Sequence, residues 1–169
     1  MFGKIIFAVA LSLTAAPVLA QTAPDPAHMP GEDAVAPYVA SNANAGAEPF
    51  EGTAMLEAFH GREGIDRIVD DLVDRNVADP RISDVFARTD MGRLRRTLKE
   101  QFCYILNGGC DYTGRDMTAG HQDTGLQSAD MGALVENLQA AMTAEGVPFG
   151  QQNRFLARLA PMKRAVVTR

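Results

Sequence analysis

Apolar side chains recur at intervals of three and four residues over most of the chain beyond residue 62, and this spacing favours one class of fold. Residues three or four apart lie on the same face of an α-helix, so the spacing predicts helices with one apolar side. No segment shows the strict alternation that indicates a half-buried strand. The sequence therefore predicts an all-α fold. The stripe of the first predicted helix, over 62–78, consists of Ile65, Ile68, Val69, Leu72, Val73, Asn76 and Val77.

Capping and helix-breaking residues divide this pattern into separate helices. Pro80 ends the first helix, because its ring disfavours helical conformation in the residue before it. Thr89 or Asp90 is a natural N-cap for the next long helix, which the glycines at 108–109 end. The predicted helical segments are 62–78, a short turn at 82–86, 91–106, a helix that Asp130 caps and Gly146 ends, and a last helix from Pro148 with a kink at Pro161.

The first twenty residues predict a secretory signal peptide. Lys4 supplies the positive start, residues 5–13 the apolar centre, and residues 18–20 a small-residue cleavage site. The apolar run is shorter than the roughly 20 residues that span a bilayer as a helix. We therefore expect export to the periplasm, cleavage, and no stable membrane insertion afterwards. An uncleaved membrane anchor is the alternative.

Residues 21–50 predict a disordered tether. This stretch contains five prolines, eight alanines and four acidic side chains, and no Lys or Arg. Such a composition does not bury enough apolar surface to offset the entropy lost on ordering. Residues 51–169 have the size of one domain.

The charge of the chain argues against a nucleic-acid partner. Beyond residue 50 there are 15 basic and 17 acidic side chains, so the domain lacks a cationic footprint. Arg93, Arg95 and Arg96 form the only basic cluster. We interpret this cluster as a solvated helix face.

Two cysteines, Cys103 and Cys110, lie seven residues apart. In an oxidising compartment such a pair predicts a structural disulfide, whereas two free thiols would indicate a reducing compartment. Neither cysteine belongs to a CxxC or CxxCH motif, which argues against thioredoxin-type chemistry and covalent attachment of haem.

The chain has three histidines, at positions 28, 60 and 121, without the spacing of a zinc site. His121 lies near the end of a long predicted loop, 109–129, and long ordered loops are often functional. One histidine among helices with broad apolar faces is compatible with axial ligation of haem iron. Taken alone, a single histidine is more often an ordinary surface or capping residue.

Several short motifs occur in a definite order. Residues 108–121 contain Gly-Gly, then Tyr-Thr-Gly-Arg-Asp-Met, then Ala-Gly-His. Upstream, residues 78–82 read Ala-Asp-Pro-Arg-Ile, and Phe86 precedes Thr-Asp-Met at 89–91. Downstream, Leu-Val-Glu begins at residue 134 and Gly-Val-Pro at residue 146. Together these motifs resemble the group I truncated haemoglobins over about residues 55–165.

The resemblance implies a truncated globin fold, a two-over-two helical sandwich around haem b. It implies that His121 is the proximal ligand of the iron, that Phe86 packs against the haem plane and that Met117 lines the proximal side. It further implies hydrogen bonds or charge neutralisation for the two haem propionates, for which Arg and hydroxyl groups are suited. The implied propionate partners are Thr89, Arg93, Tyr112 and Arg115, and for the last two a purely structural role in the loop is the alternative.

The expected distal side of the haem departs from the family pattern. Val73 stands where most members carry a tyrosine, and Leu94 and Leu98 stand where a polar group is common; Phe102 follows on the same helix. Loss of a hydrogen-bond donor would weaken oxygen binding roughly ten- to 150-fold. Gln101 is a possible substitute donor, but we expect it to be solvated.

Three functions follow from this interpretation. The first is reversible binding of a diatomic gas (O₂, NO or CO) at the haem iron. The second is a haem enzyme of NO-dioxygenase or peroxidase type, which would need a reductase partner for turnover of NO. The apolar distal pocket argues against it, because such reactions need a polar group near the developing charge. The third is a helical binding module without a cofactor.

Overall fold

The apolar stripe at 62–78 forms the longest helix of the computed structural model, which describes residues 25–167. Regular structure within these residues is entirely helical. The predicted signal peptide lies in residues 1–24, outside the described residues. In chain order the helices are the 3₁₀ helix η1 (Asn42–Ala45), α1 (Ala54–Ala58), α2 (Gly61–Ala78), α3 (Ser83–Phe86), α4 (Met91–Ile105), α5 (Met117–His121), α6 (Ser128–Ala144), α7 (Phe149–Leu159), the 3₁₀ helix η2 (Ala160–Met162) and α8 (Lys163–Val166).

The helix boundaries follow local chemistry. The Asp90 side chain accepts a hydrogen bond from the Arg93 backbone amide at 3.0 Å and caps α4. Helix α6 begins three residues earlier than predicted, because Gln127 rather than Asp130 is its N-cap. Asp130 occupies the third helical position instead and accepts from the Gln127 amide at 2.8 Å, completing a capping box.

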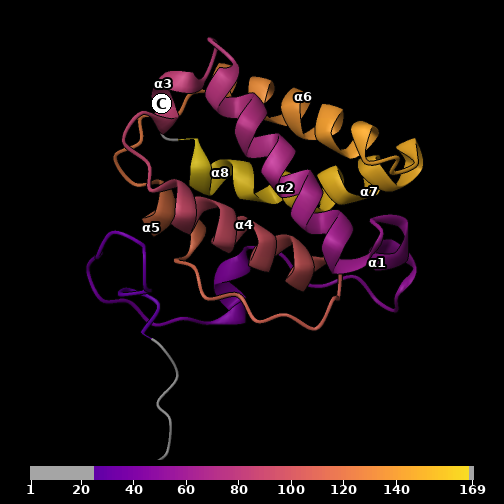
Figure 1. Cartoon of the computed structure of the whole chain (residues 1–169), viewed down its shortest axis with the longest axis horizontal. Helices are drawn as coiled ribbons and strands as arrows, with labels where there is room; N and C mark the ends of the chain where they lie inside the picture. The colour runs from indigo at the N-terminus through magenta and orange to yellow at the C-terminus, as the bar shows by residue number, and fades with distance from the viewer. Residues whose placement is uncertain (1–24, 168–169) are drawn as a thin grey trace, which may run out of the picture.

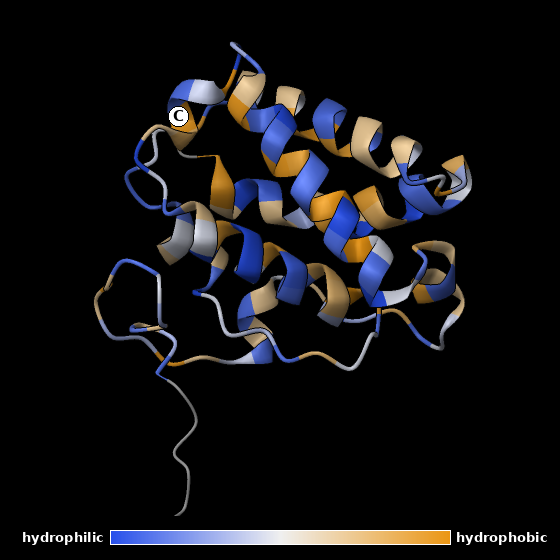
Figure 2. Cartoon of the chain, viewed as in Figure 1, coloured by the Kyte–Doolittle hydropathy of each residue, from blue (hydrophilic) through white to orange (hydrophobic). Residues whose placement is uncertain are grey.

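The long helices form two layers. Helix α2 packs against both α4 and α6, and α6 packs against α7. In Figure 1, α2 and α4 lie in front of α6 and α7, which gives the two-over-two arrangement of a truncated globin. The ribbon of α2 changes repeatedly between apolar and polar in Figure 2, as expected of a helix with one buried side.

Three aromatic rings join the layers in the core. Phe59 and Phe102 both pack edge-to-face on Phe155, with ring centroids 5.1 and 4.9 Å away. Such pairs add about 0.5–1.5 kcal/mol each beyond the burial of their area. No helix of residues 25–167 is long and apolar enough to cross a membrane.

Residues 26–40, which we call the N-terminal strap, are ordered on the surface of the domain. The strap lies beneath α4 and α5 in Figure 1, and it is followed by η1, where Ala45 is fully buried. The Tyr38 hydroxyl donates to the Thr113 carbonyl at 2.8 Å. The prediction of a disordered tether is therefore wrong for residues 25–50. Composition measures the apolar surface within a segment, whereas this segment is held by polar groups of the domain.

Candidate functional site

A cavity of about 820 Å³ lies between the layers, within the range of small-molecule and cofactor sites. Its walls are mainly apolar and come from α2 to α8 together with the strap. This one cavity brings together most of the site residues that are predicted from the sequence. Those that line it are Phe86, Thr89, Arg93, Leu94, Leu98, Phe102, Tyr112, Arg115, Met117 and His121.

Val73 is the exception among the predicted cofactor-binding residues. It is fully buried in the core and is not among the described residues that line the cavity. Leu72 and Asn76 line the cavity from α2 instead. Val73 is rotated by about 100° from Leu72 around the helix axis, whereas Asn76, four positions after Leu72, lies on nearly the same side as Leu72. The resemblance assigns Val73 to a position of the family pattern, but it does not show which face of the helix borders the cavity.

His121 ends α5 and is half-buried in the cavity wall. Its Nδ1 lies 2.7 Å from the Met117 carbonyl oxygen. A carbonyl only accepts, so Nδ1 carries the proton and donates it, and Nε2 keeps a free lone pair. Helix α5 is itself fixed by Asp116, which caps it by accepting from the Ala119 amide at 3.0 Å. A histidine held in this tautomer can coordinate a metal through Nε2.

Arg93 is one of the cationic residues that line the cavity, together with Arg115 and Lys163. Its Nη1 donates to the Pro26 carbonyl at 3.0 Å and its Nη2 to the Asp33 carbonyl at 2.7 Å. Its Nε is buried and has no hydrogen-bond partner among residues 25–167. A buried donor without a partner is costly, so an anionic group at the cavity would fit this site. The carboxylates of a haem have the required charge.

The interpretation of the basic cluster as a solvated helix face is wrong for Arg93 and Arg96. Their side chains are only 17% and 19% exposed, and both contact Glu32 of the strap. The third member, Arg95, points elsewhere and pairs with Asp70 and Asp74 of α2. Two of the three arginines thus bind an acidic side chain of the strap, and the third binds α2.

The loop before α5 is organised by a buried tyrosine. The Tyr112 hydroxyl donates to the Arg115 carbonyl at 3.0 Å, and burial raises the pKa of this phenol above its usual range. Thr89 donates weakly to the Val85 carbonyl at 3.4 Å, and Arg115 donates to the Ala36 carbonyl at 3.3 Å. These groups line the cavity, but each also has a partner within the protein.

Two buried amides line the cavity, although the sequence predicted a solvated position for Gln101 and no role in the site for Asn76. Gln101 is 7% exposed and its Nε2 donates to the Ala45 carbonyl at 2.8 Å, so the expectation of a solvated glutamine is wrong. Asn76 is 2% exposed and accepts from Asn137 at 3.0 Å. The position of Asn76 within an apolar stripe was the available signal.

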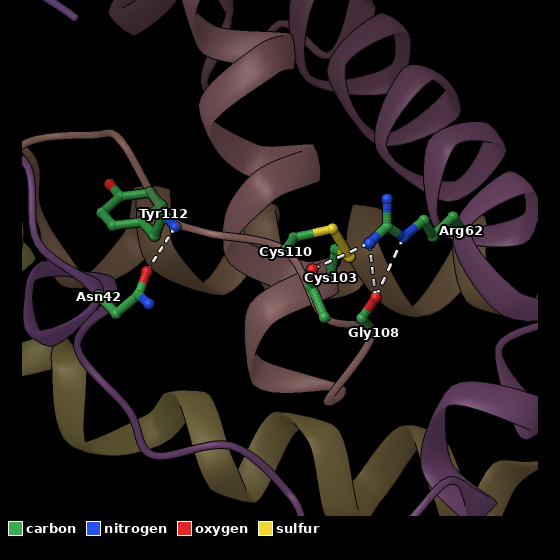
Figure 3. Close-up of a disulfide and its surroundings, with 7 residues drawn as sticks. Asn42, Arg62, Cys103, Gly108, Cys110 and Tyr112 are labelled. Carbon is green, nitrogen blue, oxygen red and sulfur yellow. Dashed lines mark hydrogen bonds between the residues drawn. A yellow bond between two sulfur atoms is a disulfide. The ribbon is translucent and has the colours of Figure 1, made fainter. Parts of the chain in front are cut away.

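Cys103 and Cys110 form a disulfide, the pairing that the sequence predicts, with Cα atoms 5.7 Å apart. As Figure 3 shows, the disulfide links the end of α4 to the loop segment that leads to Tyr112. Arg62 holds the intervening turn by donating to the Gly108 carbonyl at 2.8 Å. The Tyr112 amide donates to the Asn42 side chain at 2.7 Å. The loop is therefore fixed from both sides.

Three features together define a globin-type protein. They are an apolar cavity between two helical layers, a histidine in its wall that is held in one tautomer, and an arginine whose Nε has no hydrogen-bond partner among residues 25–167. Residues 54–168 match the bacterial-like globin family. The chain belongs to this family, as a group 1 truncated globin.

Curated relatives and solved structures agree with this assignment. The chain is 30% identical over 118 residues to a group 1 truncated haemoglobin of Mycolicibacterium paratuberculosis, covering 70% of this chain and 87% of that protein. It is 31% identical over 117 residues to one from a Nostoc species, covering 69% and 99%. The fold resembles truncated haemoglobin of Tetrahymena pyriformis in its Fe(III) form, with a TM-score of 0.65, 23% identity, and coverage of 68% and 98%.

Proposed function

We propose that this chain holds haem b in the cavity and reversibly binds a diatomic gas at an iron atom coordinated by His121 Nε2. The observation that carries the proposal is the hydrogen bond from His121 Nδ1 to the Met117 carbonyl, in the wall of a cofactor-sized cavity. This bond fixes the tautomer that leaves Nε2 free, and it holds the orientation of the ring. Membership of the globin family supports the cofactor class.

The other residues have distinct roles in this proposal. The apolar walls, including Phe86 and Phe102, exclude water and bury the porphyrin. Arg93 Nε provides a donor for a propionate, and its fixed charge requires no reorganisation on binding. The chemistry that haem supplies when bound is reversible coordination of a small gas.

The distal wall favours ligands that need no hydrogen bond. Leu94 and Leu98 line the cavity, and the Gln101 amide is already committed to the Ala45 carbonyl. Oxygen gains more than CO from a nearby donor, because its bound form carries more charge. We therefore propose weak oxygen binding relative to CO. Export to the periplasm is part of the proposal, and the disulfide, which is durable in an oxidising compartment, supports it.

The decisive experiment is an absorption spectrum of the haem-reconstituted protein and of His121→Ala. We expect a Soret band in the wild type and its loss or a marked shift in the variant, because the axial ligand is removed. His60→Ala is the matched control, since His60 is a surface residue that pairs with Glu145 at 3.1 Å and does not line the cavity. An identical spectrum for wild type and His121→Ala would refute the proposed ligation.

A further inference from the structure

The N-terminal strap covers part of the cavity, although it lies outside the residues that match the globin family. Val35 and Tyr38 line the cavity together with the helices. The family match begins at residue 54, so these two positions have no counterpart in the family pattern. The strap is thus an additional wall that this chain contributes to its site.

The strap contacts the two arginines that line the cavity. Carbonyl groups of Pro26 and Asp33 accept from the two terminal nitrogens of Arg93. The Arg115 guanidinium lies 5.5 Å from the centre of the Tyr38 ring, within the range of a cation–π contact. Both terminal nitrogens of Arg93 donate to the strap, and Nε is the one guanidinium nitrogen without a hydrogen-bond partner among residues 25–167.

Glu32 anchors the strap by charge. Its side chain is 7% exposed, and it accepts from Arg96 Nε at 2.6 Å and from Arg96 Nη2 at 2.9 Å. Arg93 lies 3.4 Å from the same carboxylate. The hydrogen bonds from Arg96 lower the pKa of Glu32, so the carboxylate remains charged. A buried carboxylate with two arginine neighbours is strongly held, because removing one partner leaves the others uncompensated.

A second contact ties this anchor to the loop before α5. Arg96 Nη1 donates to Glu100 at 3.0 Å and to the Thr113 hydroxyl at 2.5 Å. The Thr113 hydroxyl in turn donates to the Glu100 carboxylate, and the Thr113 backbone carbonyl accepts from the Tyr38 hydroxyl. The strap, α4 and the loop before α5 are therefore joined in one polar network at the edge of the cavity.

We propose that the N-terminal strap is a wall of the haem site that slows release of the cofactor, and that Glu32 is a positioning residue for Arg93. This inference rests on the proposed haem binding. Haem leaves the cavity only when the strap detaches, so the network around Glu32 contributes to the barrier for release. Val35 and Tyr38 are additional residues that contact the cofactor.

The test measures how fast the ferric protein loses haem to an excess of apomyoglobin. We expect Glu32→Gln to release haem faster, on the order of tenfold, because the strap loses its charged anchor. The matched control is Glu145→Gln, which removes an equally close Glu–Arg pair, with Arg67, away from the cavity. This control is expected to leave the release rate unchanged.

Limited proteolysis of the strap provides a readout that does not depend on gas binding. We expect haem to protect the strap from cleavage in the wild type and to protect it less in Glu32→Gln. If Glu32→Gln folds poorly, Tyr38→Phe removes only the hydroxyl, which donates to the Thr113 carbonyl at 2.8 Å and lies 3.2 Å from the Pro26 carbonyl. This variant is expected to release haem several-fold faster, because the strap loses the hydrogen bonding of that hydroxyl.

The possible outcomes separate the two proposals. Normal His121-dependent spectra with equal release rates for wild type, Glu32→Gln and Tyr38→Phe would overturn the strap inference alone. Slower release from Glu32→Gln would also overturn it, since Glu32 would then compete with the propionates for Arg93. A wild type without a His121-dependent Soret band would overturn the proposed function and the strap inference with it.

Discussion

At the scale of single residues, Gly114 shows how closely the loop before α5 is packed. A methyl group on Gly114 would overlap the hydroxyl and ring carbons of Tyr112. Its backbone conformation is open to any residue, so the requirement for glycine is one of space. The motif that resembled the globin family thus has a packing reason for its glycine.

We expect Gly114→Ala to destabilise the protein by about 1–3 kcal/mol, because the tyrosine must move from its bond to Arg115. The measurement is the free energy of unfolding in urea. Gly150→Ala is the matched control: nothing lies within 4 Å of a methyl group there, and alanine suits the helix better. Equal stabilities for the two variants would show that Tyr112 adapts freely.

The sequence identified the chemical groups of the site better than their orientation. His121 and nine other predicted residues line the cavity, because their motif carries them together. Val73 does not line the cavity and Gln101 is buried rather than solvated, since the face that a residue presents depends on how the helix is rotated against its neighbours. Helical periodicity fixes the spacing of a stripe, but small rotations decide which of its edge positions reach a cavity.

At the scale of helices, Glu145 connects the end of α6 to the beginning of α2. It accepts from Arg67 at 2.6 Å and contacts His60, and its side chain is only 13% exposed. The hydrogen bond from Arg67 lowers the pKa of Glu145 to about 2 from its ordinary value of 4.5. The ionised carboxylate therefore stabilises the contact between the two helices.

This contact gives a pH-dependent prediction. A carboxylate with a lowered pKa stabilises the folded state above its unfolded pKa of 4.5, and the contribution disappears as the pH falls towards 2. We expect Glu145→Gln to lower the free energy of unfolding by roughly 1 kcal/mol near neutral pH, a small value because Arg67 is exposed. In urea titrations, the difference between variant and wild type is expected to shrink on acidification. A difference that grows in acid would contradict the assignment.

The helices were predicted more accurately than the segment that precedes them. Capping and breaking residues act locally, so Asp90 and Pro80 mark boundaries that the structure keeps. The order of the strap depends on Arg93 and Arg96, which lie about 60 residues further along the chain. Local composition carries no information on such a distant partner.

At the scale of the whole molecule, the cavity makes stability depend on the cofactor. A cavity of about 820 Å³ in a domain of this size withholds apolar contacts that a bound porphyrin would supply. A ligand that binds only the folded state stabilises it according to its concentration and affinity.

We expect haem at about a hundred times its Kd to stabilise the folded protein by about 2.7 kcal/mol. The thermal midpoint of unfolding should rise by several degrees, measured by circular dichroism with and without haem. Haem is expected to raise the thermal midpoint of His121→Ala less than that of the wild type, and to raise the midpoint of His60→Ala by the same amount as in the wild type. Equal midpoints with and without haem for the wild type would argue against a cofactor in this cavity.

The disulfide has a further consequence for the way the chain matures. Two cysteines permit a single intramolecular connectivity, so oxidation within one molecule has no wrong product to reshuffle. The two thiols are separated by only seven positions and meet early, because a short loop closes at little entropic cost. Oxidative maturation of this globin therefore requires an oxidant but no disulfide isomerase.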